Sequence, residues 1–500
     1  MSLQFITGNS GNGKTKYLFN RIVKEAKANP RDNYLVIVPE QFTMQTQRQL
    51  VDLSENKAIM NIDVLSFKRL AYRVFDELGI TNLTVLEETG KNLVLRKLAA
   101  QEADKLGVIG RNLNRIGYIS EVKSLLSELV QYNISPEELG RYIASGRLSD
   151  TLSDKLKDVL VLYEAFEKFM QDKYITAEEI LNVLSNVAEE SAILRNSVIA
   201  FDEFTGFTPI QNQLIKKLFV ISKKIYVTLT IDCREDIFKS RGMQELFDMP
   251  KRTVKSLTEM AAFYGIEVEE PIILDKNYRL AENEELSFME QQLFRKRRCS
   301  FKKAPKHIHI DCLRDPKQEL TKIARRINEL VRNENLRYRD IAIVTGDVNI
   351  YAGYVREIFD KYNIPYFIDA TQEILFHPFI EFIRSIPDIA AQNFSADAVF
   401  RFLRCGFSEL LDSEIDVLEN YVLACGVRGK SAWDKKWVRL PKHKAGYDIE
   451  LLNQSREYIM ELLKPVYQVF SDKKSTVKDY VLAIYKLIVL LDIPDKLAKK

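Results

Sequence analysis

The chain has 500 residues, 46% of them hydrophobic, which is enough apolar material for about three packed domains. It contains 19 Gly and 14 Pro and shows no repeat of about 20 to 50 residues, which excludes collagen-like, solenoid and disordered classes. The 73 basic and 70 acidic residues give a net charge of +3, so there is no global field that would attract polyanions, and any nucleic-acid contact must use local basic surfaces.

The cysteines and the apolar runs predict the compartment. The five cysteines are odd in number, lie far apart and form no C-x-x-C pair, which argues against a disulfide scaffold and a self-contained zinc site. The N-terminus lacks a signal-peptide pattern, and the longest apolar run, residues 487–491, is far shorter than the roughly 20 residues that span a bilayer. We therefore expect a soluble cytoplasmic protein with reduced thiols and no membrane contact.

The first 90 residues alternate short apolar strands with helical patterns. Strands are expected at residues 3–7, 34–38 and 58–65, and Ser66 is placed to cap a helix that ends at Gly79. This β-α-β order predicts an α/β domain with a parallel sheet.

Residues 87–195 show apolar residues at helical spacing only, which predicts a helical insertion. Continuous apolar runs then return at residues 198–201 and 224–231, as is typical of strands buried on both faces of a parallel sheet. We therefore expect one α/β domain, formed by residues 1–86 and 196–290, interrupted by the insertion.

The second half of the chain repeats this organisation. Residues 291–306 form a basic linker, either simply solvated or in contact with phosphates. Residues 307–400 are expected to begin a second α/β domain, and residues 401–500 to be mainly helical. In the second α/β domain, strands are expected at residues 307–312, 341–345 and 365–368. These strands would not by themselves complete a sheet. Because they are too few, we expect the chain to stop before a further domain.

A phosphate-binding motif follows the first strand. GNSGNGKT, residues 8–15, fits G-x-x-x-x-G-K-[ST] between a strand and a helix, where backbone N–H groups and the helix N-terminus can cradle phosphate. Lys14 would reach the β and γ phosphates of ATP, and the Thr15 hydroxyl would bind Mg²⁺. The alternative is a Gly-rich turn without a ligand. The predicted nucleotide-binding residues are Gly8, Asn9, Ser10, Gly11, Asn12, Gly13, Lys14 and Thr15.

Two carboxylates follow the strand at residues 198–201. Asp202 would act in the Mg²⁺ shell, and Glu203 would polarise the attacking water as a general base. The alternative is an acidic pair that caps the next helix. With Lys14, these residues make up the predicted catalytic group.

An ordered series of segments resembles superfamily 1 helicases of the UvrD and RecB type, and most closely the AddB family. The resemblance covers essentially the whole chain. The segments are SLQFITGNSGNGKT (2–15), VPEQFTMQTQRQL (38–50), VLSFKRLAYRVF (64–75), FDEFTGFTPIQ (201–211), YRDIAIVTGD (338–347) and YNIPYFID (362–369).

This resemblance implies RecA-like motor domains with helical insertions. It also implies a subunit of an ATP-dependent helicase and exonuclease that works with an AddA-type partner on broken duplex ends in homologous recombination. The family's nuclease domain with its iron-sulfur cluster is expected to be absent from this chain, whose cysteines lack a suitable spacing. In this superfamily the segments after the second and third strands line the path of single-stranded DNA. The candidate DNA contacts are Gln41, Thr43, Gln45, Ser66, Phe67 and Lys68, with a core position as the alternative for Phe67.

The chain also departs from the family of active helicases. DCREDIF, residues 232–238, lies where they carry G-D-x-x-Q-S-[IY], so that Glu235 replaces the Gln that senses the γ-phosphate. Gly346 stands where they often have Arg, and because only seven residues precede Gly8 we expect no upstream Gln segment that reads adenine. Two hypotheses remain: a working DNA-dependent ATPase, or a recognition scaffold that hydrolyses little or no ATP. A small-molecule P-loop kinase is a third, weaker hypothesis, since it predicts no helical insertion.

Overall fold

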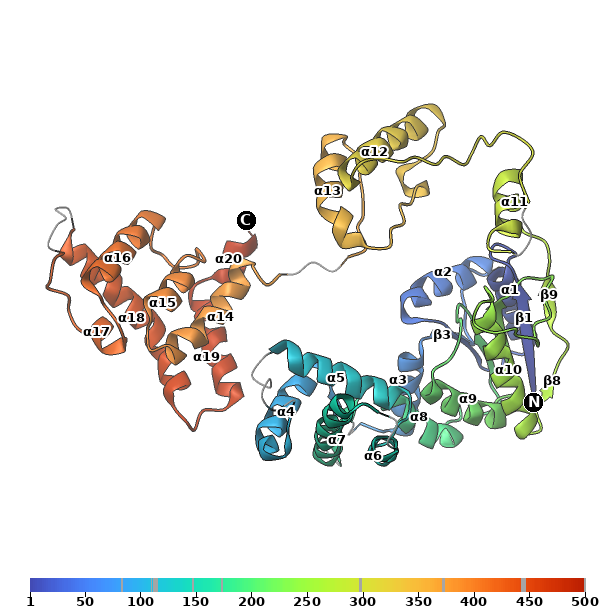
Figure 1. Ribbon diagram of the computed structural model, residues 1–500, viewed down its shortest axis with the longest axis horizontal. Helices are drawn as coiled ribbons and strands as arrows, with labels where there is room; N and C mark the ends of the chain where they lie inside the picture. The colour runs from blue at the N-terminus through green and yellow to red at the C-terminus, as the bar shows by residue number, and fades with distance from the viewer. Residues whose placement is uncertain are drawn as a thin grey trace. The chain divides into compact units, whose positions relative to one another are not determined.

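The computed structural model describes residues 1–81, 84–108, 110, 116–145, 148–171, 174–295, 299–370, 374–441 and 447–498. The chain divides into two compact units, Met1–Ile310 and Asp311–Lys500, and each is described by itself (Figure 1).

A parallel sheet forms the centre of the first unit. Within the described residues it has seven strands, in the order β3-β2-β6-β7-β1-β8, with β9 also paired to β1. The strands are β1 (Ser2–Gly8), β2 (Tyr34–Ile37), β3 (Ile62–Leu65), β6 (Val198–Phe201), β7 (Lys224–Thr230), β8 (Glu267–Val268) and β9 (Ile272–Leu274). The α/β class expected from the sequence is confirmed, and the strands after residue 196 join those before residue 66 in one sheet.

The two faces of this sheet are covered by different helices. Alternate strand residues point to opposite faces, so that Leu35 and Ile37 lie in one core while Tyr34 and Val36 lie in the other. The first core contains residues of α3 (Phe67–Leu78), α8 (Ile180–Val187), α9 (Pro209–Ile221) and α10 (Asp248–Phe263). The second contains residues of α1 (Lys14–Ala28) and α2 (Thr43–Leu53). Burial on both faces explains why the strand sequences are continuously apolar.

Local signals define the helix ends near the site. The Ser66 hydroxyl accepts a hydrogen bond from the N–H of Arg69, and Gly79 ends α3 in the left-handed region at φ 68°. The predicted cap and stop are therefore confirmed. The strand expected over 58–65 is shorter, because only residues from Ile62 onward pair with β2.

The helical insertion between β3 and β6 has its own core, built from Leu95, Leu126, Leu162 and Phe166 among others. Its elements are β4 (Val85–Leu86), α4 (Glu88–Gln101), α5 (Ile116–Gln131), α6 (Pro136–Ala144), α7 (Asp150–Met170) and β5 (Ile175–Thr176). The last helix of the predicted insertion, α8, instead contributes Ile180 and Leu184 to the core of the main sheet. The exact boundaries of the insertion stay predictions.

Within the described residues, the regular secondary structure of the second unit consists of helices. Its helices are α12 (Pro316–Asn333), α13 (Val348–Lys361), α14 (Pro378–Ala391), α15 (Ala396–Leu403), α16 (Asp412–Cys425), α17 (Lys430–Asp434), α18 (Ile449–Ser471), α19 (Val477–Leu490) and α20 (Ile493–Ala498). The helices expected near 318–332 and 350–362 are present. The strands expected at 307–312, 341–345 and 365–368 are wrong, since these described residues form no ladder. A strand requires a hydrogen-bonded neighbour, and the apolar side chains of Ile310, Val344 and Phe367 are exposed instead of covered.

No helix within the described residues is both long enough and apolar enough to cross a bilayer.

Candidate nucleotide-binding site

The loop between β1 and α1 has the backbone conformation of a phosphate cradle. Gly11 and Gly13 have φ values of 87° and 78°, a region that residues with a Cβ rarely adopt. Gly13 lies at the N-cap of α1 and has no side chain to cap the helix, so the first N–H groups of α1 face the loop. The predicted strand, loop and helix arrangement is therefore present.

A second segment, which follows β9, closes over this loop. The Asn12 amide donates to the carbonyl of Leu274 at 2.5 Å, and the Asn277 amide donates to the carbonyl of Ser10 at 3.0 Å. The N–H of Tyr278 donates to the carbonyl of Gly11 at 3.0 Å. The contact is so close that a Cβ on Gly11 would lie 2.7 Å from the Asn277 Oδ1. Residues 274–279 therefore fix the shape of the loop.

Lys14 and Thr15, the first residues of α1, lie near the carboxyl ends of β1 and β6. The Lys14 ammonium donates to the carbonyls of Gly8 and Asn9 at 3.1 and 3.0 Å. Burial lowers the pKa of Lys14, while Glu203 and Asp202 act in the opposite direction. The Thr15 hydroxyl lies 3.3 Å from a carboxylate oxygen of Asp202 and 3.3 Å from one of Glu203. The structure thus brings the four predicted residues together.

The carboxylates come directly after β6, which is separated from β1 by β7. Asp202 is 1% exposed, and Thr228 on β7 donates its hydroxyl to the Asp202 Oδ1. Burial raises the pKa of Asp202, and Glu203 adds to the rise. Glu203 is exposed and adopts a φ of 64°, a strained conformation in the left-handed region that residues with a Cβ rarely adopt.

The donor set fits a magnesium ion. The Oδ2 of Asp202 is buried and finds no hydrogen-bond partner among the described residues, which is costly for an oxygen that carries charge. Carboxylate and hydroxyl oxygens are the ligands that Mg²⁺ prefers, and Thr15 supplies the hydroxyl. Thr15 and Asp202 would therefore hold the ion.

These residues line a cavity of about 720 Å³ at the carboxyl ends of β1, β6 and β7. That edge is where open parallel sheets bind their ligands. The cavity also contains Tyr278 and Arg279, which were not predicted from the sequence. Arg279 brings a positive charge close enough to act on the pKa of Lys14, and the Tyr278 ring is 65% exposed. No local sequence signal indicated these two side chains, because only the pairing of β9 with β1 brings them to the same edge of the sheet as the loop.

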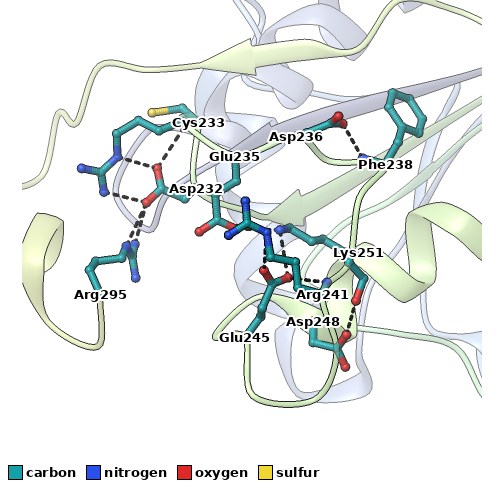
Figure 2. Close-up of polar contacts among 12 residues, drawn as sticks. Asp232, Cys233, Glu235, Asp236, Phe238, Arg241, Glu245, Asp248, Lys251 and Arg295 are labelled. Atoms are coloured by element: carbon teal, nitrogen blue, oxygen red, sulfur yellow. Dashed lines mark hydrogen bonds and ion pairs between the residues drawn. The ribbon is translucent and has the colours of Figure 1, made fainter. Parts of the chain in front are cut away.

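The segment after β7 is held by ion pairs outside this cavity (Figure 2). The buried carboxylate of Asp232 accepts hydrogen bonds from Arg234 and from Arg295, the latter at 2.8 Å, and its pKa is lowered to about 2. Although burial alone would raise that pKa, the two guanidinium groups outweigh it. Glu235 pairs with the buried ammonium of Lys251 at 2.7 Å. Glu235 does not belong to the described lining of the cavity, and its place in phosphate sensing stays a prediction.

The predicted DNA contacts divide into two groups. Ser66, Phe67 and Thr43 are buried: the hydroxyl of Ser66 binds Glu40 and that of Thr43 binds the carbonyl of Glu40. Phe67 stacks on Phe201 with ring centroids 5.8 Å apart, so its faces serve the core rather than nucleic-acid bases. The exposed members of the predicted set are Gln41, Gln45 and Lys68. Direct contact with DNA stays a prediction for these three.

Comparison with known proteins identifies the family. The family model described as "ADDB, N-terminal" matches residues 5–290, which is more than half of the chain and includes every residue lining the cavity. The chain belongs to the AddB N-terminal family.

Curated relatives of this AddB-family chain are described as subunits of an ATP-dependent helicase/deoxyribonuclease. A protein of Lachnoclostridium phytofermentans with this description is 38% identical over 504 residues, covering 99% of this chain and 44% of the relative. A protein of Clostridium tetani is 32% identical with coverages of 99% and 44%. One of Caldanaerobacter subterraneus subsp. tengcongensis is 33% identical with coverages of 100% and 44%. The AddB-family chain thus spans less than half the length of these relatives.

Proposed function

We propose that this chain works within the AddB-type subunit of a cytoplasmic ATP-dependent helicase and deoxyribonuclease, where it binds ATP with Mg²⁺ and contacts single-stranded DNA. The observation that carries the proposal is that Lys14, Thr15, Asp202, Glu203 and Arg279 line one cavity at the carboxyl edge of a parallel sheet. The names of the relatives support the assignment to a helicase and deoxyribonuclease subunit. An AddA-type subunit would be the partner on broken duplex ends during recombination, and cleavage of DNA is not assigned to residues of this chain.

The side chains have separate roles in this proposal. The N–H groups of the loop and the ammonium of Lys14 bind the phosphates, and Arg279 stabilises negative charge on the transferring phosphoryl group. Glu203, at the open side of the cavity, accepts a proton from the attacking water. Thr15 and Asp202 would hold a magnesium ion, which would supply positive charge against the phosphates. The exposed Tyr278 ring offers a surface on which the nucleobase stacks.

The structure also favours a second candidate function. Glu235 forms an ion pair with Lys251 and lies outside the described lining of the cavity. In this reading, the segment after β7 supplies no side chain that senses the γ-phosphate. A protein with an intact phosphate cradle and no sensor would bind ATP, and would serve as a nucleotide-binding scaffold for DNA and the partner subunit with slow hydrolysis.

The decisive experiment compares the wild-type chain with Lys14→Ala. Loss of a charge-assisted contact to phosphate should weaken binding of ATP and Mg²⁺ by about tenfold or more. Lys24→Ala, an exposed lysine on the same helix, is the matched control and should bind as the wild type does. Hydrolysis stimulated by single-stranded DNA and abolished by Lys14→Ala would establish the ATPase. Binding without turnover would establish the scaffold, and no binding by the wild type would contradict both.

A further inference from the structure

Asn9 connects the phosphate loop to a helix outside the cavity. Its side chain is buried: the Nδ2 donates to the Glu290 carboxylate on α11 (Glu284–Gln292) at 2.6 Å, and the Oδ1 accepts from the N–H of Cys233 at 3.0 Å. Its carbonyl belongs to the loop and accepts from the Lys14 ammonium at 3.0 Å. The main chain of Asn9 therefore contacts the phosphate-binding lysine, while its side chain contacts α11.

Helix α11 in turn holds the segment that leads out of the first unit. Near its N-terminus, the buried Glu285 accepts hydrogen bonds from the N–H groups of Lys306 and His307 at 2.7 and 2.9 Å. Near its C-terminus, the carbonyl of Gln291 accepts from Arg234 at 3.2 Å. The helix thus touches both the phosphate loop, through Glu290, and residues 306–307.

The part of the segment after β7 that begins at Glu235 does not offer an equivalent route. Glu235 is paired with Lys251, and Lys251 also pairs with Glu245 at 3.2 Å (Figure 2). The ammonium of Lys251 is buried, so releasing it would leave an uncompensated charge in a poorly hydrated place. This part of the chain is consequently fixed. The contact of the Asn9 carbonyl with Lys14 is different, because a bound phosphate would also accept a hydrogen bond from the Lys14 ammonium.

We propose that Asn9 and Glu290 are positioning residues that transmit nucleotide binding from the phosphate loop to α11 and to residues 306–307. The proposal rests on the proposed function, since it requires a phosphate group in the loop. A bound phosphate competes with the Asn9 carbonyl for the Lys14 ammonium, because a charged acceptor forms the stronger hydrogen bond. Among the described residues, the Asn9 carbonyl then keeps only the hydrogen bond from the Asn12 N–H at 3.2 Å, so the main chain at Asn9 is held less tightly and the contact between Asn9 and Glu290 loosens.

The test is amide hydrogen exchange of the full chain with and without AMP-PNP and Mg²⁺, together with calorimetric binding of the same analogue. In the wild type, the analogue should speed exchange in residues 284–292 and 304–310 by about tenfold, as expected when one charge-assisted hydrogen bond weakens. Because coupling between two sites is reciprocal, Glu290→Ala should bind the analogue up to about tenfold more tightly than the wild type, yet show no further change in exchange.

Two further variants separate a positioning role from a structural one. Glu290→Gln retains an oxygen that accepts from Asn9 and should restore the response, whereas Glu282→Ala, an exposed acid just before α11, should leave it unchanged. If the wild type binds the analogue and exchange in α11 does not rise, or if Glu290→Ala responds like the wild type, the inference is wrong while the proposed function stands. If the wild type does not bind the analogue, both fail.

Discussion

Thr228 donates its hydroxyl to one carboxylate oxygen of Asp202, and the other oxygen is buried without a hydrogen-bond partner among the described residues. Thr228 lies on β7 and Asp202 directly follows the neighbouring strand β6, at the edge where Lys14 and Thr15 also lie. A half-satisfied buried carboxylate destabilises the fold unless a cation joins it. The unpartnered oxygen of Asp202 therefore lowers the stability of the fold, and a cation bound to it would raise the stability again.

Asp202→Asn should raise stability at neutral pH and weaken nucleotide binding that depends on Mg²⁺. Burial raises the pKa of Asp202, so the folded protein binds more protons than the unfolded chain between the unfolded pKa of about 3.9 and the raised folded value. In the wild type, the contribution of Asp202 to stability is consequently lost as the pH rises through this window. Thermal unfolding at pH 7 should show a higher Tm for Asp202→Asn. The gain should disappear below pH 4, and a lower Tm at pH 7 would contradict the charge argument.

Gly11→Ala should disrupt the phosphate loop. The added Cβ would lie 2.7 Å from the Asn277 Oδ1 and 2.9 Å from the Arg279 Cβ, at a φ of 87° that alanine rarely adopts. Gly79→Ala is the matched control, because Gly79 has a φ of 68° and open space around its Cβ position. The control should lose about 1 kcal/mol of unfolding free energy from backbone strain alone. Chemical denaturation should show a larger loss for Gly11→Ala, and calorimetry a loss of nucleotide binding that Gly79→Ala does not share.

Glu235→Gln tests whether this position senses nucleotide. Since Glu235 pairs with Lys251 outside the described lining of the cavity, nucleotide affinity should stay within about twofold of the wild-type value. Lys251→Ala should destabilise the fold by roughly 2 kcal/mol or more, because it leaves Glu235 and Glu245 without their shared cation. Urea denaturation and nucleotide titration measure the two effects. Increased hydrolysis by Glu235→Gln would instead restore the sensor hypothesis.

Lys68 and Phe67 are neighbours with opposite expected roles. Lys68 is exposed, and Lys68→Ala should weaken binding of single-stranded DNA and reduce the slope of log affinity against log salt by about 0.7. Phe67 is 7% exposed in an aromatic cluster with Phe201, Phe204 and Phe207. Phe67→Ala should therefore cost about 3 to 5 kcal/mol of stability. Fluorescence anisotropy at several salt concentrations measures DNA binding. Unchanged stability for Phe67→Ala, with lost DNA binding, would show that its ring contacts DNA.

The amino-acid sequence alone determined the motif residues and the alternation of strands and helices in the first unit. These features are local: Gly11 and Gly13 permit the backbone of the loop, Ser66 caps α3, and continuous apolar runs indicate strands buried on both faces. The sequence also paired residues 8–15 with Asp202, because a phosphate loop requires a carboxylate on a nearby buried strand.

Only the tertiary structure decided which side chains complete the site and which are occupied elsewhere. Arg279 reaches the cavity because β9 pairs with β1, a contact between residues more than 260 positions apart that no local pattern reveals. Glu235 turns to Lys251 because a buried ammonium must be paired, and this depends on where α10 packs. The strands expected after residue 307 failed for the same reason: alternating apolar residues favour extension, but a ladder forms only where another strand supplies the hydrogen bonds.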